Sequence, residues 1–114
     1  MNTLQLAHTI VEALEDRKGE NIILMDIEKV AMFTGYFVIC SGTSDRMLDA
    51  LADGVIEKVR ETYGIKGRPQ GQSASGWVLV DFGSVIVHCF APETRDFYKL
   101  EDLWREGKIL LHLQ

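Results

Sequence analysis

Asp81 and His88 are the side chains that come nearest to a catalytic pair in this sequence. They lie within residues 77–90, where two apolar runs flank a Gly-Ser pair. If the runs form a β-hairpin, the carboxylate and the imidazole lie on a cross-strand diagonal, where a hydrogen bond could orient a general base. No serine is placed to act as the nucleophile, and Cys89 points to the opposite face of its strand. The pair therefore favours a structural or interface role, and we expect no catalytic residues.

Residues 41–45, Ser-Gly-Thr-Ser-Asp, could hold a phosphate group. They stand where an apolar run passes into a helical pattern, and helix N-termini with free N–H groups and hydroxyls bind phosphate. The same residue types form an ordinary N-cap, the stretch has no lysine, and Asp45 would repel an anion. Helix capping is therefore the favoured interpretation.

Three carboxylates, Asp26, Glu28 and Asp81, are the candidates for a metal site. A Gly-Ser turn after a strand resembles that of nucleotidyltransferases, which place it beside metal-binding acids. Metal-assisted phosphoryl transfer needs at least two such acids to converge, and no basic group is placed to hold a triphosphate. A nucleotide-binding enzyme of the nucleotidyltransferase type is the alternative function.

The two cysteines, Cys40 and Cys89, lie in apolar runs with no second cysteine or histidine at metal-ligand spacing. Metal sites need converging nitrogen and sulfur ligands. We therefore expect two reduced thiols in the core, no metal and no cofactor.

Length and charge narrow the class of protein. A chain of 114 residues that is 46% hydrophobic can bury one core, so we expect one domain over residues 1–114. The net charge of −5 disfavours direct nucleic-acid readout, which depends on clustered Lys and Arg. No segment approaches the roughly 20 apolar residues that span a bilayer. We expect a cytoplasmic protein that binds no membrane.

Three helices are predicted from apolar residues at spacings of three and four. The first begins after Thr3 as N-cap and ends near Gly19; the second runs from Ser44 to Gly64; the third opens at Pro92. The apolar positions of the third are Phe97, Leu100, Leu103 and Trp104.

Strands are predicted at residues 22–25 and 36–40, antiparallel because their connection is short. Residues 65–76 are rich in Gly, Ser and Pro and read as a loop, with at most a short edge strand near Arg68. Residues 109–113 fit a strand, a helix extension or an ordered tail. The fold class is α/β, with a mixed sheet flanked by helices.

The hairpin is the most informative surface, since Gly83-Ser84 suits a two-residue turn of type II′. Its core face pairs Phe82 with Val85, Val80 with Val87, and Val78 with Cys89. Its other face sets Trp77, Leu79 and Asp81 opposite Phe90, His88 and Ile86. This mixed face either lies under a helix or stays open as a contact patch, because apolar patches with polar rims bind proteins.

Three segments carry a family resemblance: GYFVICSGTS (residues 35–44), WVLVDFGSVIVH (77–88) and RDFYKLEDLW (95–104). In this order and spacing, the sequence resembles the ribosomal silencing factor family (RsfS, or Iojap) over nearly its whole length. The resemblance implies a nucleotidyltransferase-like topology without the active site. Two departures are Gly35 and Gln70, where the family usually has acids.

The resemblance also implies a non-catalytic function. The partner would be the large ribosomal subunit, contacted through ribosomal protein fourteen, and occupancy of that site would block joining of the small subunit and repress translation. The implied contact residues are Trp77, Leu79, Asp81, His88, Tyr98, Leu100 and Trp104. When the partner is absent, an open apolar face makes a homodimer plausible.

Overall fold

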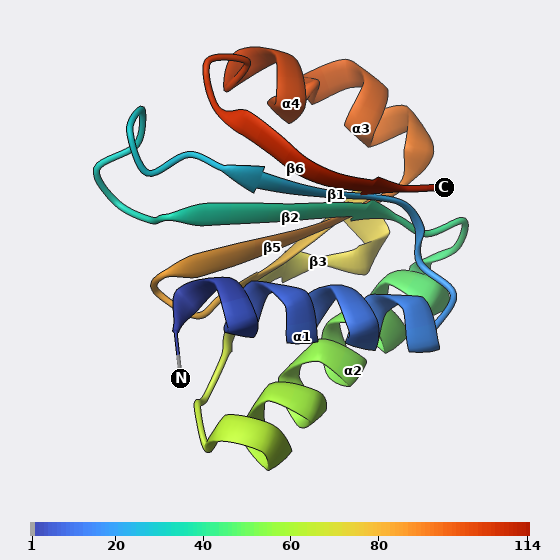
Figure 1. The fold of residues 1–114 in the computed structure, drawn as a ribbon. Coiled ribbons are helices and arrows are strands. Elements are labelled where there is room, and N and C mark those ends of the chain that lie inside the picture. The colour runs from blue at the N-terminus through green and yellow to red at the C-terminus, as the bar shows by residue number, and fades with distance from the viewer. Residues whose placement is uncertain (1) are drawn as a thin grey trace.

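A mixed six-stranded sheet forms the centre of the computed structural model, which describes residues 2–114 (Figure 1). The helices are α1 (Thr3–Asp16), α2 (Asp45–Tyr63), α3 (Pro92–Tyr98) and α4 (Leu100–Leu103), with a short 3₁₀ turn at Ser73–Ser75. The strands are β1 (Glu20–Asp26), β2 (Tyr36–Ser41), β3 (Arg68–Gln72), β4 (Trp77–Asp81), β5 (Val85–Phe90) and β6 (Lys108–Leu113). Their order is β3-β4-β5-β2-β1-β6. The predicted α/β class is confirmed.

Strand directions follow from the lengths of the connections. β1 and β2 pair antiparallel, as predicted. The pairing of β2 with β5 is parallel, and the other pairings between described strands are antiparallel. The chain between β2 and β5 includes α2, which gives it the length that a parallel connection requires.

Helices α1 and α2 pack side by side on one face of the sheet and close the larger core (Figure 1). The hairpin residues predicted to face the core, such as Val80 and Val87, are buried there. Cys40 and Cys89 are adjacent in the β2–β5 register and are buried, free thiols, as predicted.

The helix ends are partly as predicted. Ser44 caps α2, accepting a hydrogen bond from the Met47 N–H at 3.1 Å, and Gly64 ends that helix with φ 71°. For α1 the predicted cap was wrong: Asn2, one residue before Thr3, accepts from the Gln5 N–H at 2.8 Å. A capping box with Gln5 favours that earlier start.

The short edge strand considered near Arg68 is present as β3, which pairs with β4 at the edge of the sheet, where Pro69 is tolerated. The segment after Pro92 differs from the sequence prediction. The helical pattern after Pro92 breaks at Lys99, whose φ of 47° separates α3 from α4. Two of the four apolar positions, Phe97 and Leu103, are 78% and 71% exposed. Of the three alternatives for residues 109–113, the strand is correct: these residues lie in β6, which pairs antiparallel with β1.

Candidate partner-binding surface

A cluster of rings covers the face of the sheet opposite α1 and α2. The Trp77 ring lies 4.8 Å from that of Phe90 and 4.9 Å from that of Tyr98, measured between centroids. The Phe37 ring lies 4.6 Å from His88 and 5.8 Å from Trp104. Tyr98 is the last residue of α3, and Trp104 follows α4. Both short helices lie on this side of the sheet (Figure 1).

The hairpin has the register predicted from its sequence. Leu79 pairs with His88 and Asp81 with Ile86, and the Phe82 N–H donates to the Val85 carbonyl at 3.0 Å. Gly83 adopts φ 83°, a conformation that favours glycine. The mixed face of the hairpin therefore points toward the ring cluster.

His88 lies inside this cluster and not on its surface. Its side chain is 5% exposed, and burial lowers its pKa from 6.5 to about 4. The indole Nε1–H of Trp77 donates to His88 Nδ1 at 3.2 Å, while His88 Nε2 is buried without a partner among the described residues. The imidazole is therefore neutral at pH 7.

The possible hydrogen bond between Asp81 and His88 is not formed, because each side chain has another partner. Asp81 Oδ1 accepts from the Gly83 N–H at 2.7 Å, and Oδ2 lies 3.5 Å from the Arg68 guanidinium. The carboxylate closes the turn two residues ahead, a common role of Asp in turns. The imidazole is held by Trp77 and not by a carboxylate.

The seven predicted contact residues fall into three groups by exposure. Tyr98 is exposed at 48%, and Trp77, Leu79, Asp81 and Trp104 are half-buried. His88 and Leu100 are buried and belong to the layer beneath. The two buried residues can support a contact surface, but they do not form part of it in this structure.

Sequence reasoning missed a group of exposed apolar residues beside this surface. In the loop between β1 and β2, Met32 is fully exposed and Phe33 is 58% exposed. The Phe33 ring lies 5.8 Å from Trp104 and 6.1 Å from Phe37, so the loop continues the ring cluster. Adjacent Met and Phe between two strands were the available signal, because loops seldom carry two large apolar residues at their tips.

We call the accessible part of this surface the aromatic face. It comprises Phe33, Trp77, Leu79, Asp81, Tyr98, Leu103 and Trp104.

Asp81, one of the three acids of the alternative function, lies far from the other two. Asp81 and Asp26 end β4 and β1, and strands β5 and β2 lie between them. At about 4.8 Å per strand spacing, this separates their backbones by about 14 Å. Among residues 2–114, no group of three or more His, Cys, Asp or Glu side chains could hold a metal ion. The Ser44 hydroxyl, part of the candidate phosphate loop, is engaged in capping α2.

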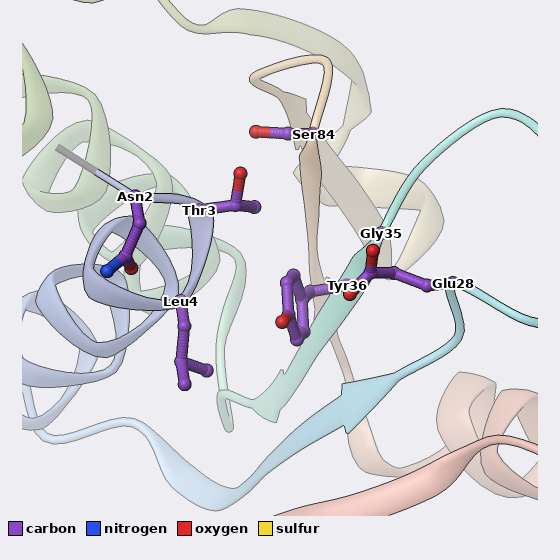
Figure 2. Close-up of a pocket in the computed structure, with 7 residues that line it drawn as sticks. All are labelled: Asn2, Thr3, Leu4, Glu28, Gly35, Tyr36 and Ser84. Atoms are coloured by element: carbon purple, nitrogen blue, oxygen red, sulfur yellow. The ribbon is translucent and has the colours of Figure 1, made fainter.

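A pocket of about 400 Å³ opens between the start of α1 and the starts of β2 and β5 (Figure 2). Burial and the nearby carboxylates of Glu28 and Asp26 raise the pKa of Tyr36, which lines it. The lining residues are Asn2, Thr3, Leu4, Glu28, Gly35, Tyr36 and Ser84. None of them is basic, so the pocket does not suit a nucleotide phosphate. A Cβ at Gly35 would lie 3.2 Å from Glu28 Cγ, so the missing side chain leaves room for Glu28.

Comparisons with known proteins bear on the identity of the chain. The family model described as "Ribosomal silencing factor during starvation", RsfS, matches residues 1–113. The chain belongs to the RsfS family.

Relatives and a solved structure agree with this assignment. The RsfS chain is 32% identical to the ribosomal silencing factor RsfS of Bacillus subtilis, over 96% of this chain and 92% of that protein. It is 35% identical to the mouse protein "Mitochondrial assembly of ribosomal large subunit protein 1", over 83% of this chain and 43% of that protein.

The fold is shared with a crystal structure of a Chromobacterium violaceum protein. The TM-score is 0.87 at 37% identity, and the match covers 91% of this chain and 87% of the other. The three sequence segments that suggested the family lie in β2, in the β4–β5 hairpin and in α3–α4. In this RsfS chain, the latter two contribute most of the aromatic face. No helix within residues 2–114 combines the length and the apolar composition that a membrane span requires.

Proposed function

We propose that this chain is a silencing factor that binds the large ribosomal subunit through ribosomal protein fourteen and thereby blocks association with the small subunit. The contact is made by the aromatic face. The mechanism is occupancy without catalysis, so repression depends on affinity and concentration. Membership of the RsfS family and the name of the mouse relative, which refers to the ribosomal large subunit, support this proposal.

The exposure of large apolar side chains carries the proposal. Phe33, Phe97 and Leu103 are each more than half exposed, and Tyr98 is nearly so. The Phe33 ring lies 5.8 Å from that of half-buried Trp104, and the Tyr98 ring lies 4.9 Å from that of half-buried Trp77 and 5.0 Å from that of Phe97. Clustered exposed apolar residues with aromatic members are typical of protein-binding sites, and Trp and Tyr are the commonest energetic centres of such sites.

The net charge of the chain indicates the chemistry of its partner. Near α3 and α4, the exposed acids Asp96, Asp102 and Glu106 are interspersed with exposed Lys99 and Arg105, and Asp81 is paired with Arg68. With a net charge of −5, the chain would be steered toward a basic surface. We therefore expect binding to weaken as the salt concentration rises.

Co-sedimentation with purified large subunits on a sucrose gradient tests the proposal. We expect the wild-type chain to travel with the large subunit and to reduce the amount of joined ribosomes. The double variant Tyr98→Ser with Leu103→Asp alters two exposed residues of the aromatic face and should remain in the light fractions. Trp77 and Asp81 are less suitable targets, because both hold the hairpin through hydrogen bonds.

Arg60→Ser is the matched control. It makes the net charge more negative by one, as the double variant does. Arg60 is exposed in the last turn of α2, on the other side of the sheet. Unchanged co-sedimentation of the double variant would exclude the aromatic face as the contact. If the free chain forms a homodimer through the same face, the double variant should also be monomeric in sedimentation velocity.

A further inference from the structure

Arg95 is a buried cation that connects four separate segments of the chain. It lies in α3 with 9% exposure. Its Nη1 donates to the Asn21 carbonyl and to Ser41 Oγ, both at 2.8 Å. Its Nε and Nη2 donate to Glu101 Oε2 at 3.3 and 3.2 Å. One side chain thus joins α3 to the start of β1, the end of β2 and helix α4.

The carbonyl that Arg95 contacts is made available by an irregularity in β1. The β1–β2 register shifts between Glu20 and Ile23, and Asn21 adopts φ 49°. A β-bulge leaves backbone groups unpaired, and Asn tolerates a positive φ better than most residues. The guanidinium of Arg95 satisfies the Asn21 carbonyl.

The α3–α4 segment has few other anchors. Among the described residues, α3 buries Arg95 alone and α4 buries Leu100 alone. Helices of seven and four residues are too short to be stable by themselves. Their placement on the sheet therefore depends on these two side chains and on the ring contacts of Tyr98 and Trp104.

We infer that Arg95 is a positioning residue for partner binding: its hydrogen bonds hold α3–α4 in the orientation that presents Tyr98, Leu103 and Trp104. The Glu101 contact crosses the helix break at Lys99 and so fixes α4 relative to α3. This inference rests on the proposed function of the aromatic face. Lysine could not replace Arg95, because a single ammonium cannot reach acceptors on both sides of a planar fork.

Both tryptophans of the chain, Trp77 and Trp104, lie in the aromatic face. Near-UV circular dichroism and tryptophan emission therefore report directly on α3–α4. Arg95→Met should reduce the near-UV signal and shift the emission to longer wavelength. It should also weaken binding to large subunits by about ten-fold or more, because hydrogen bonds from charged groups are among the strongest.

Arg17→Met is the matched control. Arg17 also donates to a backbone carbonyl, that of Ala50, and to a carboxylate, that of Glu57. This ion pair joins the end of α1 to α2, and both helices lie on the face of the sheet opposite α3 and α4 (Figure 1). The control should leave tryptophan signals and binding at wild-type values. Amide hydrogen exchange in α1 and α2, followed in both variants, separates a local change in α3–α4 from global unfolding.

The outcomes are distinguishable. Wild-type tryptophan signals in Arg95→Met, or altered signals with undiminished binding, would overturn the inference. If Arg95→Met loses hydrogen-exchange protection in α1 and α2, Glu101→Gln is the second test. A smaller change of the tryptophan signals together with weaker binding in Glu101→Gln supports the inference. No change in either measurement overturns it. If the wild-type chain itself does not sediment with large subunits, the proposed function fails, and the tryptophan signals alone then show whether Arg95 positions the segment.

Discussion

The indole N–H of Trp77 donates to His88 Nδ1 at 3.2 Å, across the β4–β5 hairpin. An accepting Nδ1 places the proton of the neutral imidazole on Nε2, which is buried without a partner among the described residues. The same contact fixes the half-buried Trp77 ring on the aromatic face. His88 was predicted to contact the partner, but it is buried. It instead orients Trp77, which is accessible to a partner.

The free energy of unfolding should decrease as the pH is lowered, because His88 titrates. Burial lowers its folded-state pKa to about 4, below the unfolded value near 6.5. Between these values the unfolded chain takes up a proton that the folded chain does not, so stability is full above pH 6.5 and is lost as the pH falls toward 4. The loss amounts to roughly 3 kcal/mol. Urea unfolding from pH 4 to 7.5 measures it.

His88→Gln isolates this effect, because glutamine keeps an acceptor for Trp77 but does not titrate. The variant should show a shallower dependence of unfolding free energy on pH. His8→Gln is the matched control, since His8 is exposed on α1. An equally steep dependence in His88→Gln would rule out His88 as the source.

The two thiols should be inert in the folded chain. Cys40 and Cys89 are both fully buried, and a hydrogen bond with Cys40 together with burial raises the pKa of the Cys89 thiol. Because thiolates are the reactive form, we expect no release of thionitrobenzoate from Ellman's reagent at pH 8. Both thiols should react once guanidinium unfolds the chain. Rapid reaction of the folded chain would contradict the burial of Cys40 and Cys89 between β2 and β5.

Glycines at positive φ should differ in what they tolerate. Gly64 has φ 71° and open space where a methyl group would stand, so Gly64→Ala should cost only the backbone strain of about 1 kcal/mol. Gly76 has φ 81°, and a Cβ there would collide with Thr94 Oγ1. Gly76→Ala should therefore cost about 3 kcal/mol. Chemical denaturation of both variants compares them, and equal losses would contradict the crowding at Gly76.

Binding and stability should separate at the loop between β1 and β2. Phe33→Ala removes an exposed ring, so we expect it to change the unfolding free energy by no more than about 1 kcal/mol. Its affinity for large subunits should fall about ten-fold if the ring is an energetic centre of the contact. Leu4→Ala, at an exposed position of α1, is the control. An affinity of Phe33→Ala equal to that of the wild-type chain would show that this loop does not contribute to binding.

The hairpin was predictable because its signals are local. Alternation of apolar residues and a glycine at the turn fix both the register and the faces, so Val80 and Val87 fall in the core as expected. α2 was predictable for the same reason, with Ser44 and Gly64 at its ends. These elements needed no knowledge of distant parts of the chain.

Other features depend on partners far away in sequence. β3 exists because β4 offers it a ladder, although its own residues, with Pro69 and Gly71, favour a loop. Likewise, the contacts of Arg95 with Asn21 and Ser41 join residues that no periodicity connects. The burial of His88 and Leu100 also depends on distant residues, such as Phe37, whose ring lies against His88. Asp81 is an exception, because its hydrogen bond from the Gly83 N–H, two residues ahead, was a local signal that sequence reasoning missed.

The parallel pairing of β2 with β5 has a kinetic consequence. β1–β2 and β4–β5 are each joined by short connections and can form early, whereas β2 can meet β5 only after the long connection that contains α2 has closed. Chains dominated by such distant pairings fold slowly. We therefore expect truncations of Val38 or Val87, the central residues of that pairing, to slow refolding more than they hasten unfolding.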